Sequence, residues 1–571
     1  MIAVDSKLLT KVEALYDGLA KEPLRPIWIS LVPRDRVLAR ASEIASRPEL
    51  PLAGKTFAVK DNIDVAGMPT TAGCPAYAYT PSESATVVRR LEEAGAVLIG
   101  KTNMDQFATG LVGTRSPHGS CSSLFNERYI SGGSSSGSAV AVARNLVDFS
   151  LGTDTAGSGR VPAAFNGLIG LKPSRGLLSA QGVVPACRTL DCVSIFTRSC
   201  DIAYEVWQTA KGLDAADPFS RGPSSGDGAS PWMNTNFRFG VPAPDQLDFF
   251  GDTAAAELYE KAVRRLQQIG GEKIEIDFSV FRSAAELLYS GPWVAERLAA
   301  IKDFFRDHAD EMDPTVRTII GGSKRYTATD AFEAEYKLRE LCRQAEKQWK
   351  NLDVLFLPTT GTIYTHDQIA ADPIRLNTNL GYYTNFVNLM DLAAVAAPAG
   401  FRSNGLPFGV SFIGRAFTDE ALLTLASRYL GEERPLKKST GCVEIAVVGA
   451  HLTGQPLNHQ LTSRGARLQR TCRTAPNYRL YALSRCTPRK PGLVRDDDSN
   501  GPGIEVEIWS MPEDQFGSFV AEIPSPLTIG TITLEDGESV KCFLCEPYAI
   551  ASAVEITQFG GWRAYLQPMK S

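Results

Sequence analysis

Short apolar runs alternate with helix-like patterns over roughly the first 430 residues. Each apolar run is short enough to form one buried strand, and small residues dominate one helical pattern, which would let that helix pack closely on a sheet. This alternation predicts an α/β layered core. The predicted strands are 52–60, 95–100 and 149–154, and the predicted helices are 1–45, 83–93, 103–113 and 138–146.

The pattern changes near residue 431. A charged stretch that contains proline and glycine has the composition of a linker, and the short runs beyond it have the composition of strands. The sequence therefore predicts a first domain over 1–432, a linker over 433–441 and a smaller β-rich (α+β) domain over 442–571. The strands of the second domain are expected at 443–449, 478–483, 504–509 and 540–544.

Composition and charge narrow the class of protein. Of 571 residues, 44% are hydrophobic and 22% are charged, which is ordinary for a globular chain of two or more domains. The net charge of −5 gives no general reason to bind nucleic acid or an anionic membrane. The first residues lack the apolar core of a signal peptide, and no apolar run reaches the ~18 residues of a membrane span, so neither feature is expected.

The cysteines favour a reducing compartment. There are 11 of them, scattered along the chain, and an odd number does not suit a full set of disulfides. Cys542 and Cys545 form a CxxC without a second pair at zinc spacing. We interpret them as buried thiols of a strand, and a metal or redox role is the alternative. The expected location is the cytoplasm.

Two serine clusters and one lysine carry the candidate chemistry of a chain that has only 5 histidines. The clusters span 131–138 and 152–160, and Lys60 ends an apolar run upstream. A serine becomes a nucleophile when a base takes its proton, and a lysine is such a base only when it is neutral. Burial lowers the pKa of a lysine, so the apolar surroundings of Lys60 favour this role. The alternative is a strand-end lysine that reaches water.

Ser158 lies between two glycines after a predicted strand, where nothing would crowd its hydroxyl. The successive N–H groups of Thr155, Ala156, Gly157 and Ser158 can converge on one point, as an oxyanion hole requires. The alternative for this stretch is a glycine-rich turn that binds nothing.

A second interpretation of the serine clusters is a G-x-S-x-G nucleophile elbow over 133–137, with Ser135 as nucleophile. Such an elbow needs a preceding strand, and 127–130 is a poor strand. It also needs an acid and a downstream histidine, for which the candidates are His308, His366, His451 and His459.

Four motifs, at 58–64, 132–138, 152–162 and 170–176, occur in an order and at spacings that closely resemble the amidase signature family. The resemblance covers roughly residues 25–430. It implies a mixed, largely parallel twisted sheet covered by helices, and an enzyme without cofactor or metal. Two departures from the family pattern are Ser136 and Ala156, each in place of a common glycine.

The same resemblance implies the roles of three residues. Ser158 would be the acyl-enzyme nucleophile, Ser134 the bridging serine with a cis peptide bond, and Lys60 the terminal base. The reaction would be hydrolysis of an amide, with the N–H groups of 155–158 stabilising the oxyanion.

Specificity must come from other residues. A short helix is expected to start near Pro292 and to carry Arg297, with Tyr289 just before it. A guanidinium binds a carboxylate through two hydrogen bonds, whereas the alternative is a solvated arginine on a surface helix. With its C-terminal region, the chain resembles the allophanate-hydrolysing branch of the family. That resemblance implies that Tyr289 and Arg297 hold the carboxylate of allophanate, that Gly113 lines the pocket, and that ammonia and carbon dioxide are the products.

In the C-terminal region, the stretch 447–457 resembles the glycine-containing first strand and loop of a gamma-glutamylcyclotransferase-like domain. His451 or His459 would assist decarboxylation of the first product, or the domain would serve only dimerisation or partner docking. Glu505 and Glu507 share one strand face, which would be either a paired-acid site or a solvated face.

The resemblance also implies a homodimer and a functional link to urea carboxylase. The alternatives are an amidase for another small amide and a non-enzymatic interaction protein, although the intact Lys60, Ser134 and Ser158 argue against the latter.

Overall fold

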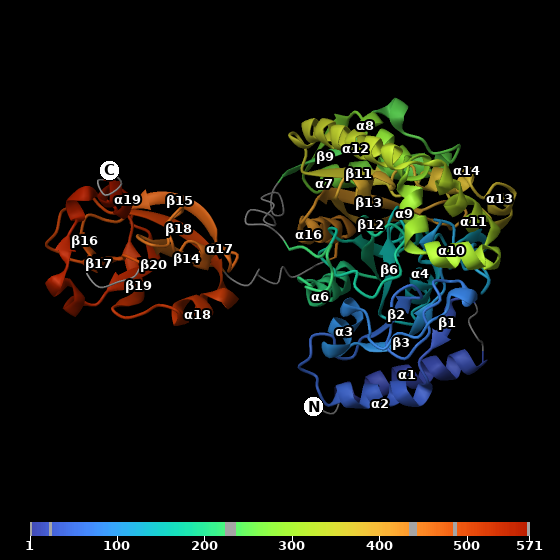
Figure 1. Ribbon diagram of the computed structural model, residues 1–571, viewed down its shortest axis with the longest axis horizontal. Helices are drawn as coiled ribbons and strands as arrows, with labels where there is room; N and C mark the ends of the chain where they lie inside the picture. Colours follow the sequence, from blue (N-terminus) through green and yellow to red (C-terminus); the bar gives the residue numbers. More distant parts are fainter. Residues whose placement is uncertain (1–2, 22–25, 223–235, 433–441, 484–487, 568–571) are drawn as a thin grey trace. The chain divides into compact units, whose positions relative to one another are not determined.

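The computed structural model describes residues 3–21, 26–222, 236–432, 442–483 and 488–567 (Figure 1). These residues divide into two compact units on either side of 433–441. The predicted linker itself lies outside the described residues. Within the described part of the chain, none of the helices has both the length and the apolar character needed to cross a bilayer.

One eleven-stranded sheet forms the centre of the first unit. Its strands run in the order β1 (Trp28–Leu31), β3 (Val97–Thr102), β2 (Thr56–Lys60), β6 (Phe149–Asp154), β8 (Cys192–Thr197), β7 (Ile169–Lys172), β12 (Leu392–Phe401), β13 (Pro407–Arg415), β11 (Val354–Pro358), β9 (Phe237–Pro242) and β10 (Gly271–Ile276). The sheet is mixed, as the family resemblance implies.

The expectation that this sheet is largely parallel is wrong, because most neighbouring strands are antiparallel. Only four of the ten neighbouring pairs are parallel, namely β2 with β3, β2 with β6, β9 with β10 and β9 with β11. The other six pairs are antiparallel. The chain returns directly from β12 to β13 without a crossover helix, and such a short connection produces an antiparallel pair.

Helices cover the sheet in three groups, each with its own apolar core (Figure 1). The first group is α3 (Thr86–Glu93), α6 (Cys200–Ala210), α7 (Thr253–Gln268) and α16 (Asp419–Leu430). The second is α8 (Ser279–Ser290), α12 (Ala328–Trp349) and α15 (Phe386–Leu389). The third is α1 (Ala3–Lys21), α2 (Arg34–Ala45) and α4 (Ser136–Ala143). Shorter helices complete the unit: α5 (Val161–Phe165), α9 (Trp293–Ala300), α10 (Lys302–His308), α11 (Pro314–Gly321), α13 (His366–Ala371) and α14 (Arg375–Leu380).

The parallel neighbours β2 and β6 bring the two candidate regions together. Every residue of both strands is buried, as is usual for parallel strands that are covered on both faces of the sheet. Their register pairs Phe57 with Phe149 and Val59 with Leu151, and the two phenyl rings stack at 5.2 Å. Because parallel strands end at the same sheet edge, Lys60 emerges beside Asp154 and the second serine cluster.

Three local predictions are wrong. The segment 103–113 forms only a 3-10 turn, Gln106–Ala108, because Phe107 and Ala108 adopt positive φ values of 49° and 51°. The Asp105 carboxylate accepts hydrogen bonds from nearby backbone N–H groups there, an arrangement that competes with helix formation. The predicted N-terminal helix is interrupted by β1, and 127–130 belongs to β5 (Asn126–Ile130), which pairs with β4 (Ser122–Ser123).

The second unit is β-rich, as predicted, and all four expected strands are present. Its main sheet has the order β15 (Arg467–Arg473), β18 (Glu505–Pro512), β14 (Cys442–Val447), β20 (Ser539–Cys545) and β19 (Leu527–Thr533). A second sheet contains β17 (Pro491–Arg495), β16 (Tyr478–Ala482) and β21 (Val554–Glu555), and the helices are α17 (His459–Thr462), α18 (Glu513–Ala521) and α19 (Trp562–Leu566). Cys542 and Cys545 are buried on β20, which confirms the prediction of buried thiols in a strand.

The predicted solvated face at Glu505 and Glu507 is wrong for Glu507, which is only 2% exposed. Its carboxylate accepts hydrogen bonds from Arg563 Nη2 at 2.5 Å and from Thr453 N at 2.8 Å. Arg563 also lies 3.3 Å from Glu505 Oε1. The two acids therefore share one guanidinium. Glu507 and Arg563 both bind the backbone of Thr453 and so hold this loop against β18.

A buried ion pair fixes the segment between β6 and α5. Arg160 donates to both carboxylate oxygens of Asp154, from Nη2 at 2.8 Å and from Nε at 2.9 Å. The same guanidinium donates to Thr384 O at 3.1 Å and to Asn388 Oδ1 at 3.2 Å. Arg160 thereby ties the second serine cluster to α15.

Removing this guanidinium should destabilise the first unit. Arg160→Met would leave Asp154 buried without its charge partner, so we expect a loss of about 3–5 kcal/mol in the free energy of unfolding. Denaturant unfolding of both proteins measures the loss. Arg306→Met, which removes an exposed pair with Asp303, is the matched control and should leave the stability close to wild type. Equal stability of the Arg160 and Arg306 variants would contradict the structural role of the buried pair.

Candidate active site

Lys60, Ser134 and Ser158 form one hydrogen-bonded chain. Lys60 Nζ lies 2.7 Å from Ser134 Oγ, which lies 3.0 Å from Ser158 Oγ. Lys60 and Ser134 are completely buried, and Ser158 is 3% exposed. The peptide bond between Gly133 and Ser134 is cis, as the resemblance implies. The three side chains come from the end of β2, the loop before α4 and the loop after β6.

The chain of polar atoms can carry protons in either direction. Each hydroxyl can donate one hydrogen bond and accept others, and it rotates to suit its partners. In one arrangement Lys60 donates to Ser134, which donates to Ser158, whose hydroxyl lies 3.4 Å from Gly110 O. Reversing the donors turns the same geometry into a relay from Ser158 through Ser134 to a neutral amine. Such a relay would activate Ser158 for attack on an acyl carbon.

Burial lowers the pKa of Lys60 to about 7, although the charges of Asp105, Asp191 and Asp154 oppose that shift. The alternative of a strand-end lysine that reaches water is therefore wrong. Thr153 is a partner that the motifs did not single out, because it looks like any other residue of β6. Its Oγ1 accepts a hydrogen bond from Lys60 Nζ at 2.7 Å.

Two of the acids near Lys60 also hold loops of the site. Asp105 accepts hydrogen bonds from Gly113 N at 3.0 Å and Arg115 N at 2.9 Å, and burial raises its pKa. Asp191 accepts a hydrogen bond from Thr155 Oγ1 at 2.5 Å, and burial raises its pKa to about 6. Both acids lie far along the chain from Lys60, so no local motif pointed to them.

The structure modifies the predicted set of oxyanion donors at one residue. Gly157 N donates to Asp154 Oδ1 at 2.9 Å, so this N–H is already committed. Thr155, Ala156 and Ser158 remain as the candidate donors. Gly157 has a φ of 139°, which a side chain would disfavour, whereas Ala156 has no positive φ and fits without strain.

Arg297 and Tyr289 meet as predicted. The expected short helix is α9, which begins after Pro292, and Arg297 is only 2% exposed, so the alternative of a solvated arginine is wrong. The guanidinium lies over the Tyr289 ring at 5.4 Å, and Nη2 is 3.5 Å from the tyrosine hydroxyl. Nη1 donates to Thr109 Oγ1 at 3.0 Å, a contact that the sequence did not indicate. A buried, tethered arginine is suited to bind a carboxylate.

Gly113 lies against the first serine cluster. Its N–H points to Asp105, and a side chain at this position would collide with Gly132 O and the serines of the first cluster. The loop carbonyl that approaches Ser158 belongs instead to Gly110.

The elbow interpretation of Ser135 is contradicted by its contacts. Ser135 Oγ donates to Thr153 O at 3.2 Å and accepts from Thr153 N at 3.3 Å, so the hydroxyl is tied to the backbone of β6. Of the candidate histidines in the first unit, His366 pairs with Ser122 Oγ at 3.0 Å, and His308 stacks on Phe304.

In the second unit, His451 and His459 lie near the ends of one loop. His451 Nε2 is 2.8 Å from Gln460 Oε1, and its ring stacks on Phe543 at 4.9 Å. Burial lowers the pKa of His451, which favours the neutral imidazole. His459 Nδ1 lies 3.0 Å from Pro456 O.

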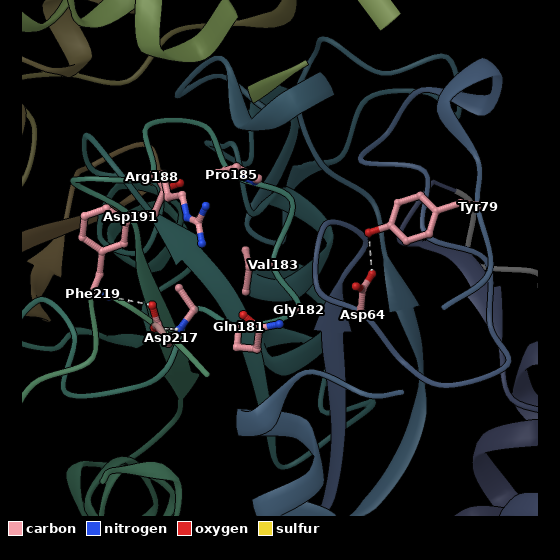
Figure 2. Close-up of a pocket in the computed structure, with 11 residues that line it drawn as sticks. Asp64, Tyr79, Gln181, Gly182, Val183, Pro185, Arg188, Asp191, Asp217 and Phe219 are labelled. Carbon is pink, nitrogen blue, oxygen red and sulfur yellow. Dashed lines mark hydrogen bonds between the residues drawn. The ribbon is translucent and has the colours of Figure 1, made fainter. Parts of the chain in front are cut away.

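A separate hollow of about 260 Å³ lies along the segment 180–191 (Figure 2). Lys60 and the two serines do not line it. Figure 2 shows Tyr79 donating to Asp64 on one side, at 2.8 Å, and Arg188 and Phe219 on the other. Asp191, which also binds Thr155, connects this hollow to the Ser158 loop.

Two family models match the chain. The amidase model matches residues 26–423, and the model for the allophanate hydrolase C-terminal domain matches residues 443–567. The first match covers the whole Lys60–Ser134–Ser158 arrangement, and the second covers the β-rich unit.

Curated relatives extend the match to nearly the whole chain. The urea amidolyases of Saccharomyces cerevisiae and Lachancea kluyveri are each 44% identical, over 98% of this chain and 32% of their own length. This chain therefore spans about a third of the length of these relatives. A glutamyl-tRNA(Gln) amidotransferase component of Prochlorococcus marinus is 31% identical, over 66% of this chain and 83% of its own length.

Solved structures give the same result. Allophanate hydrolase of Kluyveromyces lactis is 43% identical with a TM-score of 0.74, covering 98% of this chain and 97% of that one. The urea amidolyase of the same organism is 43% identical with a TM-score of 0.73, over 99% of this chain and 36% of its own. The chain described here thus belongs to the amidase family.

Proposed function

We propose that this enzyme hydrolyses allophanate, a urea that carries one carboxyl group, through an acyl-enzyme on Ser158. The observation that carries the proposal is the buried chain from Lys60 through Ser134 to Ser158, within a first unit that also holds a buried arginine. The similarity to an allophanate hydrolase over both units supports this substrate. The arrangement of hydroxyls and amine alone supports acyl transfer, and Arg297 adds the reason for an acidic substrate.

In the proposed reaction, neutral Lys60 takes the proton of Ser134 while Ser134 takes the proton of Ser158. Ser158 Oγ attacks the urea carbonyl, and the N–H groups of Thr155, Ala156 and Ser158 stabilise the oxyanion. The tetrahedral intermediate collapses with loss of ammonia, to which the relay returns the proton. Water, deprotonated by the same relay, then releases the acyl group as N-carboxycarbamate. Loss of carbon dioxide from this unstable product leaves carbamate, which gives ammonia and a second carbon dioxide.

Arg297 is the proposed carboxylate ligand, with Tyr289 beside it. A buried guanidinium favours an anionic substrate because little water competes for its hydrogen bonds. Thr109 holds Nη1, which fixes the plane of the guanidinium. The runner-up is hydrolysis of another small amide, with the C-terminal unit serving only assembly.

For the C-terminal unit we propose assistance to the decarboxylation, with His451 or His459 as the participant, and assembly as the alternative. His451 is the better placed of the two, because it is partly buried next to Phe543 and holds a neutral ring. We further propose a homodimer, and a functional link to a urea carboxylase, because carboxylation of urea is the chemistry that forms allophanate.

Removing the proposed nucleophile should abolish turnover. Ser158→Ala is expected to lower kcat for ammonia release from allophanate by roughly four to six orders of magnitude, because alanine has no hydroxyl that could form the acyl-enzyme. Ser135→Ala is the matched control from the neighbouring cluster and should retain turnover of the wild-type order. Comparable ammonia release by the Ser158 variant and the wild type would refute the proposed nucleophile.

The pH profile should report on Lys60. Only the neutral amine can act as base, and its pKa is about 7, so kcat/KM should rise with pH through about 7 and level off above it. Asp191→Asn removes an anion that raises this pKa, so the rising limb should move to lower pH. Steady-state rates between pH 5 and 9 test both expectations, because this range is centred on the pKa of about 7 of Lys60. A limb that does not move in the Asp191 variant would assign it to another group.

Arg297 should separate acidic from neutral substrates. Arg297→Met is expected to lower kcat/KM for allophanate by roughly 10²–10³-fold, because the carboxylate loses a charged, buried partner. Turnover of propionamide, which has no carboxylate, should stay at the low wild-type level. Arg297→Lys keeps the charge without the paired donors and should lie between the two. An equal loss on both substrates would contradict the carboxylate clamp.

A further inference from the structure

Thirteen buried side-chain polar atoms of the first unit have no hydrogen-bond partner among the described residues, and three of them lie around the candidate site. They are Arg297 Nε, Thr384 Oγ1 and Asn385 Oδ1. The exposed fractions of these residues are 2%, 0% and 6%. Leaving a buried polar group without a partner is unfavourable, so each such atom needs an explanation, and a ligand that supplies the partner is one. Neither Thr384 nor Asn385 belongs to any of the sequence motifs.

Thr384 lies directly against the Ser158 loop. A Cβ placed on Gly157 would come within 2.5 Å of Thr384 Oγ1, so the threonine hydroxyl occupies the space that a side chain at Gly157 would need. The Thr384 carbonyl accepts a hydrogen bond from Arg160 Nη1, which fixes the backbone at this point. The hydroxyl therefore stands beside the residue that precedes the proposed nucleophile.

Asn385 extends the same wall toward Tyr289. It occupies the N-cap position of α15, where an asparagine side chain normally accepts a hydrogen bond from the first turn, yet it makes no such bond. Its side chain instead lines a groove of about 150 Å³ together with Tyr289, Ala285 and Tyr382. Thr384 and Asn385 thus connect the Ser158 loop with the residue that lies over Arg297.

The chemistry of these atoms defines what they can bind. Arg297 Nε is a donor and requires an acceptor, whereas Asn385 Oδ1 is an acceptor and requires a donor. A dicarboxylate would satisfy only the arginine, because it has no N–H group. A molecule with a carboxylate at one end and amide N–H groups at the other would satisfy both.

We propose that Thr384 and Asn385 form a second, N–H-binding half of the substrate site, opposite the carboxylate-binding half at Arg297. This inference rests on the proposed function. Asn385 accepts a hydrogen bond from a substrate N–H, and the Thr384 hydroxyl binds the substrate next to the carbon that Ser158 attacks. A site built to bind a substrate N–H strongly rejects an analogue that lacks it, since its own polar group is then left unpaired. The pair therefore selects carboxylated ureas and amides over dicarboxylates.

The test compares allophanate, which has N–H groups, with malonate, used as a competing dicarboxylate probe that has none. Asn385→Leu, close in size but without the acceptor, should raise KM for allophanate about tenfold or more, the effect of losing roughly 1.4 kcal/mol. The inhibition constant of malonate should change by no more than about twofold, because malonate has no N–H group to bind Asn385. The loss of a hydrogen bond would change the constant by more than twofold. Arg297→Met should raise both constants. Asn351→Leu makes the same chemical change at an exposed position and should alter neither.

Thr384 provides an independent variant. Thr384→Val keeps the shape and removes the hydroxyl, so it should lower kcat/KM for allophanate, and Thr384→Ser should restore it. Equal Tm values for wild type and variants establish that folding is intact. If the Asn385 variant does not fold, the Thr384 pair gives the same comparison between allophanate and malonate.

Two results would overturn the inference. One is an unchanged KM for allophanate in Asn385→Leu together with an unchanged kcat/KM in Thr384→Val. The other is a parallel weakening of allophanate and malonate, which would show a general distortion of the cavity. A wild-type protein that releases no ammonia from allophanate would instead refute the proposed function, so the two failures are distinguishable.

Discussion

The central constraint in this structure is a fully buried lysine amine that has to be close to neutral near pH 7. Burial disfavours the ammonium form, and the pKa of Lys60 falls to about 7. Hydrogen bonds to Ser134 and Thr153 keep the amine satisfied, and three buried carboxylates limit the fall of its pKa. More negative charge would restore the ammonium and remove the base, whereas less would make the amine too weak a base to hold a proton during the reaction.

The carboxylates that set this balance also build the site. Asp154 binds Arg160 and the N–H groups of its own loop, Asp105 binds the N–H groups of Gly113 and Arg115, and Asp191 binds Thr155. The cost of burying each charge is therefore offset by hydrogen bonds that position a segment of the active site. One set of interactions thus determines both the electrostatics at Lys60 and the geometry around Ser158.

The sequence was most informative where chemistry and local backbone coincide. Lys60, Ser134 and Ser158 could be predicted because each sits in a short motif, and Arg297 because a helix start and a nearby tyrosine mark its segment. Thr153 and Asp191 could not be predicted. Thr153 meets Lys60 only when β6 lies beside β2, and Asp191 meets Thr155 only when a distant loop folds back on this segment. The segment 103–113 was mistaken for a helix since its apolar spacing is helical. The positive φ values at Phe107 and Ala108 accompany tertiary hydrogen bonds, such as Phe107 N to Ala72 O, that no local pattern reveals.

Arg160 connects the Ser158 loop with the segment of Thr384 and Asn385, the two halves of the proposed site. Its guanidinium donates to Asp154 on one side, and to Thr384 O and Asn388 Oδ1 on the other. The position of Thr384 and Asn385 is therefore fixed relative to the same carboxylate that holds the N–H groups of Gly157 and Gly159. Since the segments around 158 and 384 are far apart in the chain, this one buried side chain couples the proposed nucleophile to the proposed substrate wall. A substrate of so few atoms as the proposed one would make too few contacts to align the two halves by itself, so such coupling suits the proposed reaction.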